Sequence, residues 1–407
     1  MRVIVQKFGG TSVATAEGRR AVIGKVREAL ANGFSPVVVV SAMGRAGEPY
    51  ATDTLIQLAG SEGVRPGARE LDLLMSCGEI ISVVVMVQAL RASNLDAVAF
   101  TGGQAGILTD RSYGNACILE VRPDALAGAL AENKIAVVAG FQGITSDGEV
   151  TTLGRGGSDT TAAALGVALK AEVVEIFTDV DGVMTADPRL VTKAKPLTVM
   201  TYAEICEMAH LGAKVVHPRA VEIAMEGRVP LRIRSTFSDA AGTLVTDGRS
   251  LPGVEIKNDK VVTGLAHLGH MALIEIAAEQ DVNATGKAIE IFDTMAGAGI
   301  SVDMIHVSPL AVNFIISEDR VPKAVELLRG LGLSVEAATS LAKVSVVGAG
   351  MRGVPGVMAR VVKGLNRAGI AIIQSADSHT NISCLVRMAE MVQALEALHD
   401  EFGLAGE

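Results

Sequence analysis

The chain has 407 residues, of which 49% are hydrophobic and 20% are charged, and its formal net charge at pH 7 is −9. This length suits two or three domains with a sizeable core, and the composition excludes a disordered chain. The acidic charge, the lack of tryptophan and the 3% aromatic content argue against nucleic-acid binding, which needs a basic surface and often stacking platforms.

No basic N-terminal region is followed by an apolar core and a cleavage site, so we expect no export. The most apolar stretch, residues 80–90, is interrupted by Ser82 and Gln88 and is flanked by Glu79 and Arg91. It falls short of a membrane span and predicts a buried helix. Four scattered cysteines without a C-x-x-C pair indicate reduced thiols in a cytoplasmic protein rather than zinc or disulfides.

The first motif is KFGGTSV at residues 7–13, directly after a short apolar run that predicts a strand. The pattern places Lys7 at a glycine turn, where backbone amides can approach a ligand. The Thr-Ser pair is predicted to cap the next helix. Free amides at a helix N-terminus beside a cation favour an anion such as phosphate. The lysine precedes the glycines, so this is not a Walker A loop. By itself the motif fits a plain strand-to-helix turn with a surface lysine equally well.

Up to about residue 245, short β-branched runs alternate with helical patterns such as residues 19–30. The runs predict strands covered on both faces, at residues 37–40, 97–100, 135–139 and 173–177. This alternation predicts a parallel α/β sheet with helices on both sides. Ligands bind such sheets at the carboxyl ends of the strands, so we expect a shared crevice formed by the turns at 41–44, 101–103, 140–143 and 178–179.

The stretch TTLGRGGSDTT at residues 151–161 has the highest density of residues suited to ligand binding or catalysis. Three glycines surround Arg155, and Ser158-Asp159-Thr160 opens an alanine-rich helix over 162–169. Exposed amides, a guanidinium and a helix N-terminus all suit an anion. As a plain N-cap, Asp159 would contribute about 1 kcal/mol to the helix. That simpler interpretation accounts for Asp159 but not for Arg155 and the glycines.

The next motif, FTDVDGVMTADPR at residues 177–189, faintly resembles a calcium loop. Calcium is excluded because Leu190 occupies the position that needs a bidentate glutamate. The motif then fits a nucleotide-binding turn in which Arg189 reaches phosphate, or equally a polar turn ended by Pro188.

Three further residues carry alternative interpretations. Lys214 is a second lysine for a polyphosphate or a solvated surface lysine. Glu79 is a first-turn helix charge or a partner for a substrate ammonium group. His217 precedes a proline in an apolar setting, which favours a structural role.

Residues 246–260 are polar, contain Gly and Pro, and predict a linker. An internal repeat with an offset of 70 residues follows, in which Ala298-Gly299-Ile300 matches Ala368-Gly369-Ile370. Each copy predicts a small βαββαβ, ferredoxin-like unit. Two such units can pack sheet to sheet or pair across a dimer.

The G-x-G-x-x-G at 348–353 matches a dinucleotide fingerprint, but too little chain remains for two βαβαβ halves, so we expect no nicotinamide site.

Together the motifs resemble those of the aspartokinases in the amino-acid kinase family. The matching segments are KFGGTSV, Ser41-Ala42-Met43-Gly44, Cys77-Gly78-Glu79, GRGGSDT from Gly154, TDVDGVMTADPR from Thr178 and AKVVHPRA from Ala213. They occur in the family's order, and the repeats resemble its paired ACT regulatory domains. The resemblance implies a three-layer αβα domain with a mostly parallel sheet, followed by two ACT units whose strands may interleave. We expect these parts at residues 1–245, 246–260 (linker), 261–338 and 339–407.

The resemblance implies transfer of the γ-phosphate of MgATP to the β-carboxylate of L-aspartate. The product, aspartyl 4-phosphate, enters lysine, threonine, methionine and diaminopimelate synthesis. A carboxylate nucleophile is already ionised at pH 7, so catalysis should rest on positioning and charge neutralisation rather than on a general base. This chemistry suits a site rich in Lys, Arg and amides and poor in histidine.

The resemblance also implies the roles of individual residues. Lys7 and Lys214 would hold the transferring phosphate, and Asp159 would orient both lysines. The aspartate pocket would be formed by Ser41, Thr52, Glu79, Phe141, Arg155 and Ser158. ATP would contact Lys7, Gly9, Gly10, Ser12, Thr178, Asp179, Met184, Arg189 and Lys214, although some members have a tyrosine where Met184 stands. We predict no metal site made of protein side chains.

The repeats depart further from the family pattern, and residues 375–380 look like those of the diaminopimelate-responsive type. The expected effector is therefore diaminopimelate, lysine or threonine, bound by Met304, Asn313, Gln374, Ser375 and Asp377. Exposed sheet edges in the repeats predict a homodimer or higher homo-oligomer. We expect no nucleic-acid or membrane partner.

Two alternatives remain at this level. Another amino-acid kinase, acting on glutamate or acetylglutamate, would share the first domain but generally lacks the tandem repeat. A non-catalytic amino-acid sensor would keep the kinase fold, although intact Lys7, Asp159 and Lys214 argue against it.

Overall fold

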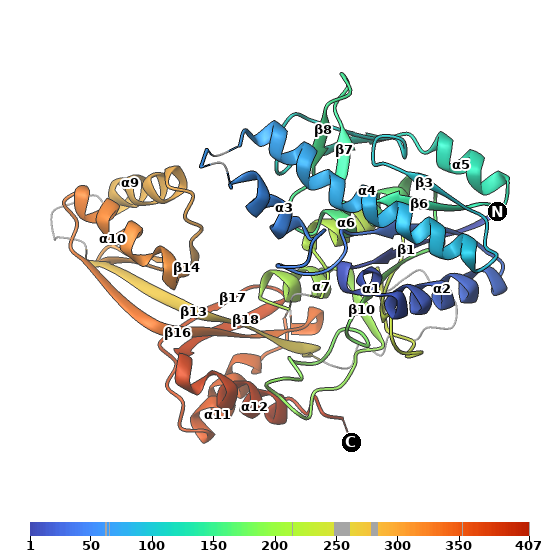
Figure 1. Cartoon of the computed structure of the whole chain (residues 1–407). Coiled ribbons are helices and arrows are strands. Elements are labelled where there is room, and N and C mark those ends of the chain that lie inside the picture. Colours follow the sequence, from blue (N-terminus) through green and yellow to red (C-terminus); the bar gives the residue numbers. More distant parts are fainter. Residues whose placement is uncertain are drawn as a thin grey trace. The chain divides into compact units, whose positions relative to one another are not determined.

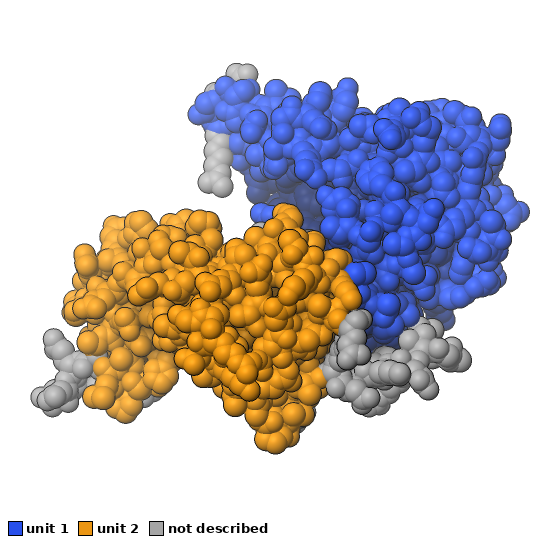
Figure 2. Space-filling view, turned by 90° about the horizontal axis from the view of Figure 1, so that it is seen from below, with its two compact units in different colours: residues 1–183, 196–209, 214–256 blue, residues 184–195, 210–213, 257–407 orange. Residues whose placement is uncertain are grey.

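The computed structural model describes residues 1–61, 63–64, 66–213, 215–247, 261–277, 284–351 and 353–406 (Figure 1). The chain divides into two compact units, each discontinuous in sequence. Unit 1 comprises residues 1–183, 196–209 and 214–256, and unit 2 comprises residues 184–195, 210–213 and 257–407 (Figure 2).

An eight-stranded sheet forms the centre of unit 1, in the order β10-β12-β11-β9-β1-β2-β6-β3. Its strands are β1 (Arg2–Phe8), β2 (Phe34–Val40), β3 (Ala97–Phe100), β6 (Ile135–Ala139), β9 (Val173–Thr178), β10 (Val199–Thr201), β11 (Leu231–Ser235) and β12 (Thr243–Thr246). All neighbouring pairs are parallel except β11 and β12. The predicted mostly parallel sheet is confirmed, and β3 and β6 have the predicted bounds.

The helices of unit 1 cover both faces of this sheet. They are α1 (Gly10–Ala14), α2 (Ala16–Ala31), α3 (Thr52–Ala59), α4 (Ala68–Ala92), α5 (Asp124–Ala131), α6 (Gly157–Ala168), α7 (Tyr202–His210) and α8 (Pro218–Glu226). On one face, α2 and α4 pack against the β-branched strand residues around Phe8 and Val38. On the other face, α6 approaches β9 so closely that a Cβ on Gly166 would lie 2.2 Å from Val174.

A second, smaller sheet in unit 1 has the order β5-β4-β7-β8. Its strands are β4 (Ile107–Thr109), β5 (Ile118–Val121), β7 (Gln142–Ile144) and β8 (Val150–Thr152). Because β7 follows β6 and β8 precedes α6, this sheet holds the two polar turns 140–143 and 151–161 beside each other.

Helix α4 is longer than the predicted buried helix at 80–90, and only one of its faces is buried. Val83, Met86 and Leu90 pack in the core, whereas Ile80 and Val84 are 37% and 50% exposed. Among the described residues, α4 is the helix that is long and apolar enough to cross a membrane. Half of its most apolar stretch is buried inside the protein. A core helix gives the same pattern, and its packing on the sheet identifies α4 as one.

Unit 2 is built on one six-stranded antiparallel sheet, in the order β14-β15-β13-β16-β18-β17. Its strands are β13 (Gly264–Ala277), β14 (Asp303–Val307), β15 (Ala311–Ser317), β16 (Val335–Val347), β17 (Gln374–Asp377) and β18 (Asn381–Arg387). Its helices are α9 (Ala284–Gly297), α10 (Val321–Gly330), α11 (Val357–Arg367) and α12 (Met391–Glu401), with short 3-10 turns at Glu318–Arg320, Ala349–Met351 and Met388–Glu390.

The two repeats share this sheet instead of stacking sheet to sheet. The long strands β13 and β16 pair with each other along both repeats, and β15 and β18 lie 70 residues apart as the repeat requires. The start of β13 supplies a strand to the second repeat, since Leu265 packs in one core with Val344 and Leu398. The strands of the two repeats are therefore interleaved within unit 2.

Residues 184–195 belong to unit 2 although unit 1 precedes and follows them in the chain. Ala186 and Val191 are buried in the core of the second repeat. Thr185 accepts a backbone hydrogen bond from Leu265 N at 2.7 Å, and its Oγ1 lies 2.9 Å from Nε2 of the buried His399. The segment that carries Arg189 is thus a structural part of unit 2. The predicted linker begins at the last residue of β12, and residues 248–260 lie outside the described residues.

Candidate active site

The first predicted motif forms a tight connection at the end of β1. Lys7 lies within the strand rather than in the turn, so the predicted start of the turn was too early. The prediction that Thr11 and Ser12 cap a helix was wrong, because α1 begins at Gly10 with Gly9 as its N-cap. The chain passes so close to the next turn that a Cβ on Gly10 would lie 2.5 Å from Ala42 O. Glycine is needed here for close approach.

The stretch at 151–161 forms a glycine turn that leads into α6. Gly154 and Gly156 have φ angles of 74° and 70°, in the left-handed region that favours glycine. Helix α6 then starts at Gly157, which makes Gly156 the N-cap and puts Asp159 in the first turn. The simpler interpretation of Asp159 as an N-cap is therefore wrong. Its carboxylate does not cap the helix and can therefore contact residues of the sheet.

Lys7 and Asp159 form the central contact of the site. Lys7 Nζ lies 2.7 Å from Asp159 Oδ1, and both side chains are largely buried, with 13% and 12% exposed. The contact is an ion pair without hydrogen-bond alignment. Asp159 Oδ2 accepts a long hydrogen bond of 3.4 Å from His217 N. Asp159 is thereby fixed from two sides, and it holds the lysine ammonium group in place.

A cavity of about 310 Å³ surrounds this pair. It brings together nine residues predicted from the sequence: Lys7, Gly10, Ser41, Thr52, Glu79, Phe141, Arg155, Ser158 and Asp159. They come from the ends of β1, β2 and β6, from α1, α3 and α4, and from the turn before α6 and the first turn of that helix. The turns at 101–103 and 178–179, which were expected to share the crevice, do not line the cavity. The turn at 101–103 follows the edge strand β3, whereas β1, β2 and β6 adjoin one another.

Two contacts fix the wall of the cavity formed by Ser158. Ser41 Oγ donates to Ser158 Oγ at 3.0 Å, and a Cβ on Gly140 would lie 2.7 Å from the same oxygen. Phe141 has a φ of 70° and donates its backbone N–H to Thr161 Oγ1 at 3.1 Å. A bulky residue with positive φ is strained, so the surrounding hydrogen bonds must hold it.

Glu79 is the one deeply buried acid of the cavity whose charge is not matched by a cation. Its Oε1 accepts from Ala42 N at 3.0 Å, while its buried Oε2 has no partner among the described residues. Burial raises the pKa of Glu79 to about 8, although the hydrogen bond from Ala42 opposes the shift. The carboxyl group is therefore mostly neutral at pH 7 until a cation approaches it.

Two residues that the sequence analysis did not select also contribute. Arg45 lines the cavity, and its guanidinium lies 3.4 Å from Asp179 in an exposed ion pair. Asp72 is buried in α4 and accepts from Thr152 N, Thr152 Oγ1 and Gly114 N, which anchors the strand before the glycine turn. An isolated acid inside an apolar helical pattern was the available signal for Asp72.

The predicted nucleotide contacts are only partly brought together. Ser12 Oγ lies 2.8 Å from Thr236 Oγ1, and Thr178 O accepts from Thr236 N at 3.0 Å, so these two meet at one residue. Met184 and Arg189 belong to unit 2, where Arg189 pairs with Asp187 at 2.7 Å. Lys214 lies outside the described residues. Within the described ranges, no group of three His, Cys, Asp or Glu residues could hold a metal ion.

Known proteins of two families match parts of the chain. Residues 2–235 match the amino acid kinase family, and residues 344–402 match an ACT domain. The chain is 48% identical over 405 residues to aspartokinase 1 of Bacillus subtilis, with 100% of both chains covered. The chain belongs to the aspartokinases. An aspartokinase of Mycolicibacterium smegmatis is 41% identical over 420 residues, which cover all of this chain and 97% of that one.

Solved structures show the same relationship. Escherichia coli aspartokinase III, in complex with aspartate and ADP, superposes with a TM-score of 0.79 at 28% identity, covering 98% of this chain and 99% of that one. An aspartate kinase of Clostridium acetobutylicum has a TM-score of 0.80 at 21% identity and supports the fold alone. As a member of the aspartokinases, the chain is an ATP-dependent phosphotransferase that acts on aspartate, as the motifs predicted.

Proposed function

We propose that the cavity of unit 1 is where the γ-phosphate of MgATP passes to the β-carboxylate of L-aspartate. The observation that carries this proposal is the buried Lys7–Asp159 ion pair in a cavity that also holds Arg155 and the unmatched Glu79. Aspartate has two carboxylates and one ammonium group. In the cavity, Lys7, Arg155 and the unmatched acid Glu79 are the groups proposed to match them.

Each polar group of aspartate then has a partner. Arg155 binds the α-carboxylate, for which a guanidinium is suited by its bidentate donors. Glu79 binds the ammonium group, which supplies the missing charge beside Oε2. Ser41, Thr52, Phe141 and Ser158 line the remainder of the cavity and orient the β-carboxylate toward Lys7.

The transfer step needs positioning and charge neutralisation rather than a general base. The β-carboxylate is ionised at pH 7 and attacks the γ-phosphorus, while the bond to the leaving ADP oxygen breaks. Lys7 neutralises charge on the transferring phosphoryl oxygens, and Asp159 keeps the lysine in place. Lys214 serves as the second cation in this proposal.

In this proposal ATP binds through Gly9, Gly10, Ser12, Thr178 and Asp179 of unit 1, and Met184 and Arg189 remain predicted nucleotide contacts. Mg²⁺ is usually held by substrate phosphates together with one or two carboxylates, so it would arrive on the nucleotide. Asp159, which pairs with Lys7 of β1, and Asp179, which directly follows β9, are the acids proposed to help hold it. When bound, the metal neutralises charge on the phosphates.

Unit 2 is proposed to bind an amino-acid effector, namely diaminopimelate, lysine or threonine. The expected effector residues lie on β14, β15 and β17, where Gln374 Nε2 donates to Met304 O and the buried Asn313 Oδ1 has no described partner. The E. coli relative was solved in complex with lysine and aspartate. The exposed edge strands β14 and β17 suit pairing in a cytoplasmic homo-oligomer.

Trapping the acyl phosphate as a hydroxamate tests the proposal. Turnover with L-aspartate, and none with L-glutamate or N-acetyl-L-glutamate, is expected from the full chain. Turnover of glutamate but not aspartate would overturn the proposed substrate. Initial rates measured with lysine, threonine and diaminopimelate, singly and in pairs, would identify the effector.

A further inference from the structure

A second cavity lies in unit 1 away from the proposed active site, and its volume is about 220 Å³. It is lined by the starts of strands, with Phe34 at the start of β2, Val173 at the start of β9 and Pro230 just before β11. Parallel strands point the same way, so this cavity is at their amino ends, whereas Lys7 and Asp159 are at the carboxyl ends. The two cavities share no lining residue.

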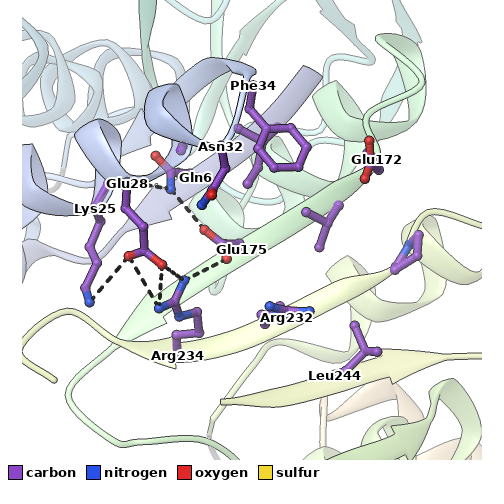
Figure 3. A pocket seen from close by; sticks show the side chains of 14 residues that line it. Gln6, Lys25, Glu28, Asn32, Phe34, Glu172, Glu175, Arg232, Arg234 and Leu244 are labelled. Atoms are coloured by element: carbon purple, nitrogen blue, oxygen red, sulfur yellow. Dashed lines mark hydrogen bonds and ion pairs between the residues drawn. The ribbon is translucent and has the colours of Figure 1, made fainter. Parts of the chain in front are cut away.

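A buried polar network forms the floor of the cavity (Figure 3). Glu175 lies between Gln6 and Arg234, accepting from Gln6 Nε2 at 2.9 Å and from Arg234 Nη1 at 3.1 Å. Glu28 bridges Arg234 at 3.2 Å and Lys25 at 3.8 Å. The contact with Glu175 fixes the amide orientation of Gln6, because the reverse orientation would bring its oxygen against a carboxylate oxygen.

Two atoms of this network have no hydrogen-bond partner among the described residues. They are Gln6 Oε1, in a residue that is 1% exposed, and Arg234 Nε, in a residue that is 7% exposed. Buried polar atoms in proteins are nearly always paired, so both atoms call for a partner. A single water needs only about 10–15 Å³, far less than this cavity provides. The space is large enough for a small molecule.

Arg232 supplies a third group with free hydrogen-bonding capacity. It lines the cavity from β11, beside Glu175 and Leu244 in Figure 3, and its guanidinium pairs with no described residue. The other cations of the network already have acids. The charged lining residues balance, with Lys25, Arg232 and Arg234 against Glu28, Glu172 and Glu175.

We propose that this cavity binds a small zwitterionic amino acid. Its carboxylate binds Arg232 and Arg234 Nε, and its ammonium group binds Gln6 Oε1 beside the Glu28 and Glu175 carboxylates. A balanced lining disfavours a ligand with net charge, which would bring an uncompensated charge into a partly buried site. The apolar wall receives an aliphatic side chain; it consists of Ile4, Ala29, Phe34, Val173, Pro230 and Leu244.

Calorimetric titration of the full chain with aliphatic L-amino acids, led by L-leucine, tests the site. Arg232→Gln should weaken binding by about tenfold or more, as expected for a lost charge-assisted contact. Ala29→Phe, which fills the cavity, should abolish it. The matched control is Arg20→Gln, which alters an exposed arginine outside the cavity on α2, the helix that also carries Ala29. It should leave the dissociation constant for leucine unchanged.

Two further comparisons test which groups of the ligand are recognised and which unit of the protein binds it. N-acetyl-L-leucine lacks the ammonium group and isopentylamine lacks the carboxylate, so both should bind at least about tenfold more weakly than leucine. Gln374→Ala, in unit 2, should not affect leucine binding. Binding of leucine that is insensitive to Arg232→Gln and Ala29→Phe, equal binding of the acetylated probe, or no binding of any aliphatic amino acid at millimolar concentration would overturn the proposal.

Discussion

Lys7 Nζ and Asp159 Oδ1 are 2.7 Å apart, and one residue comes from the second-last position of β1 while the other comes from the first turn of α6. The sheet and the helix on its face therefore bring a cation and an anion from distant parts of the chain into one buried pair. Such a pair holds a charged group where it is needed without reorganisation during the reaction.

Lys7→Ala should lower kcat for aspartyl phosphate formation by at least about a hundredfold, as for other preorganised charge stabilisers. The hydroxamate assay measures this loss. Circular dichroism and the urea midpoint should show that the variant is folded. A variant with near-normal kcat would contradict the assigned role of Lys7.

Glu79 predicts a pH-dependent affinity for aspartate. Because burial raises its pKa to about 8, binding of the ammonium group must release a proton below that pH. The dissociation constant for aspartate should therefore fall by up to about tenfold for each pH unit from 6 toward 8, and then level off. Calorimetry in buffers of different ionisation enthalpy measures both the constant and the released proton.

Glu79→Gln provides the control for that prediction. It should bind aspartate more weakly, with no proton release between pH 6 and 8. The raised folded-state pKa also means that the free energy of unfolding of the ligand-free protein should decrease as pH rises from about 4.5 to about 8. Glu79→Gln should not show this decrease. A wild-type profile without proton release would refute the ammonium assignment.

Gly10→Ala and Gly24→Ala should have opposite effects. The added Cβ at residue 10 would lie 2.5 Å from Ala42 O and 2.8 Å from Gly44 O, both backbone atoms. We expect a loss of about 1–3 kcal/mol in the free energy of unfolding and reduced kcat/KM. Gly24 lies in α2 with open space around it, so alanine should stabilise by up to about 1 kcal/mol. Urea unfolding of both variants measures the difference.

Thr185→Val tests the attachment of residues 184–195 to unit 2. The substitution keeps the shape but removes the oxygen that lies 2.9 Å from His399 Nε2 and accepts from Lys195 N at 3.0 Å. Burial lowers the pKa of His399, so the histidine is neutral at pH 7 and would lose its partner. We expect a cost of about 1–3 kcal/mol and faster hydrogen exchange across the segment.

If Arg189 serves the nucleotide as proposed, Thr185→Val should raise KM for ATP more than it changes kcat. Thr294→Val, which removes an exposed helix hydroxyl that donates to Glu290 O at 2.7 Å, is the matched control. Unchanged exchange in residues 184–195 would show that Thr185 does not hold the segment.

The parts of the fold set by local pattern were predictable. β3 and β6 have their predicted bounds because buried parallel strands are short apolar runs between polar turns. Helix caps were predicted less well, since the glycines before α1 and α6 took the cap positions expected for Thr11, Ser12 and Asp159. Close backbone approach at Gly10 decided the first case, and this contact involves a distant turn.

The residues around the first cavity were selected from their motifs, but their arrangement depends on tertiary structure. The raised pKa of Glu79 arises from burial by other elements, which no local pattern reports. The repeat in the sequence also does not predict that both copies form one sheet. That sheet depends on β13 and β16, each of which is longer than one repeat needs. Arg232 and Gln6 belong to no motif, so the second cavity had no sequence signal.

The position of residues 184–195 limits how this enzyme can be taken apart or recombined. A cut near residue 257 would leave Ala186 and Val191 on the kinase fragment without the apolar core that buries them, and would leave the ACT fragment with an open gap. A chimera that exchanges regulatory regions between relatives must therefore carry residues 184–195 with the ACT sequence. If unit 2 binds a feedback effector as proposed, variants resistant to it are better sought through substitutions than through truncation.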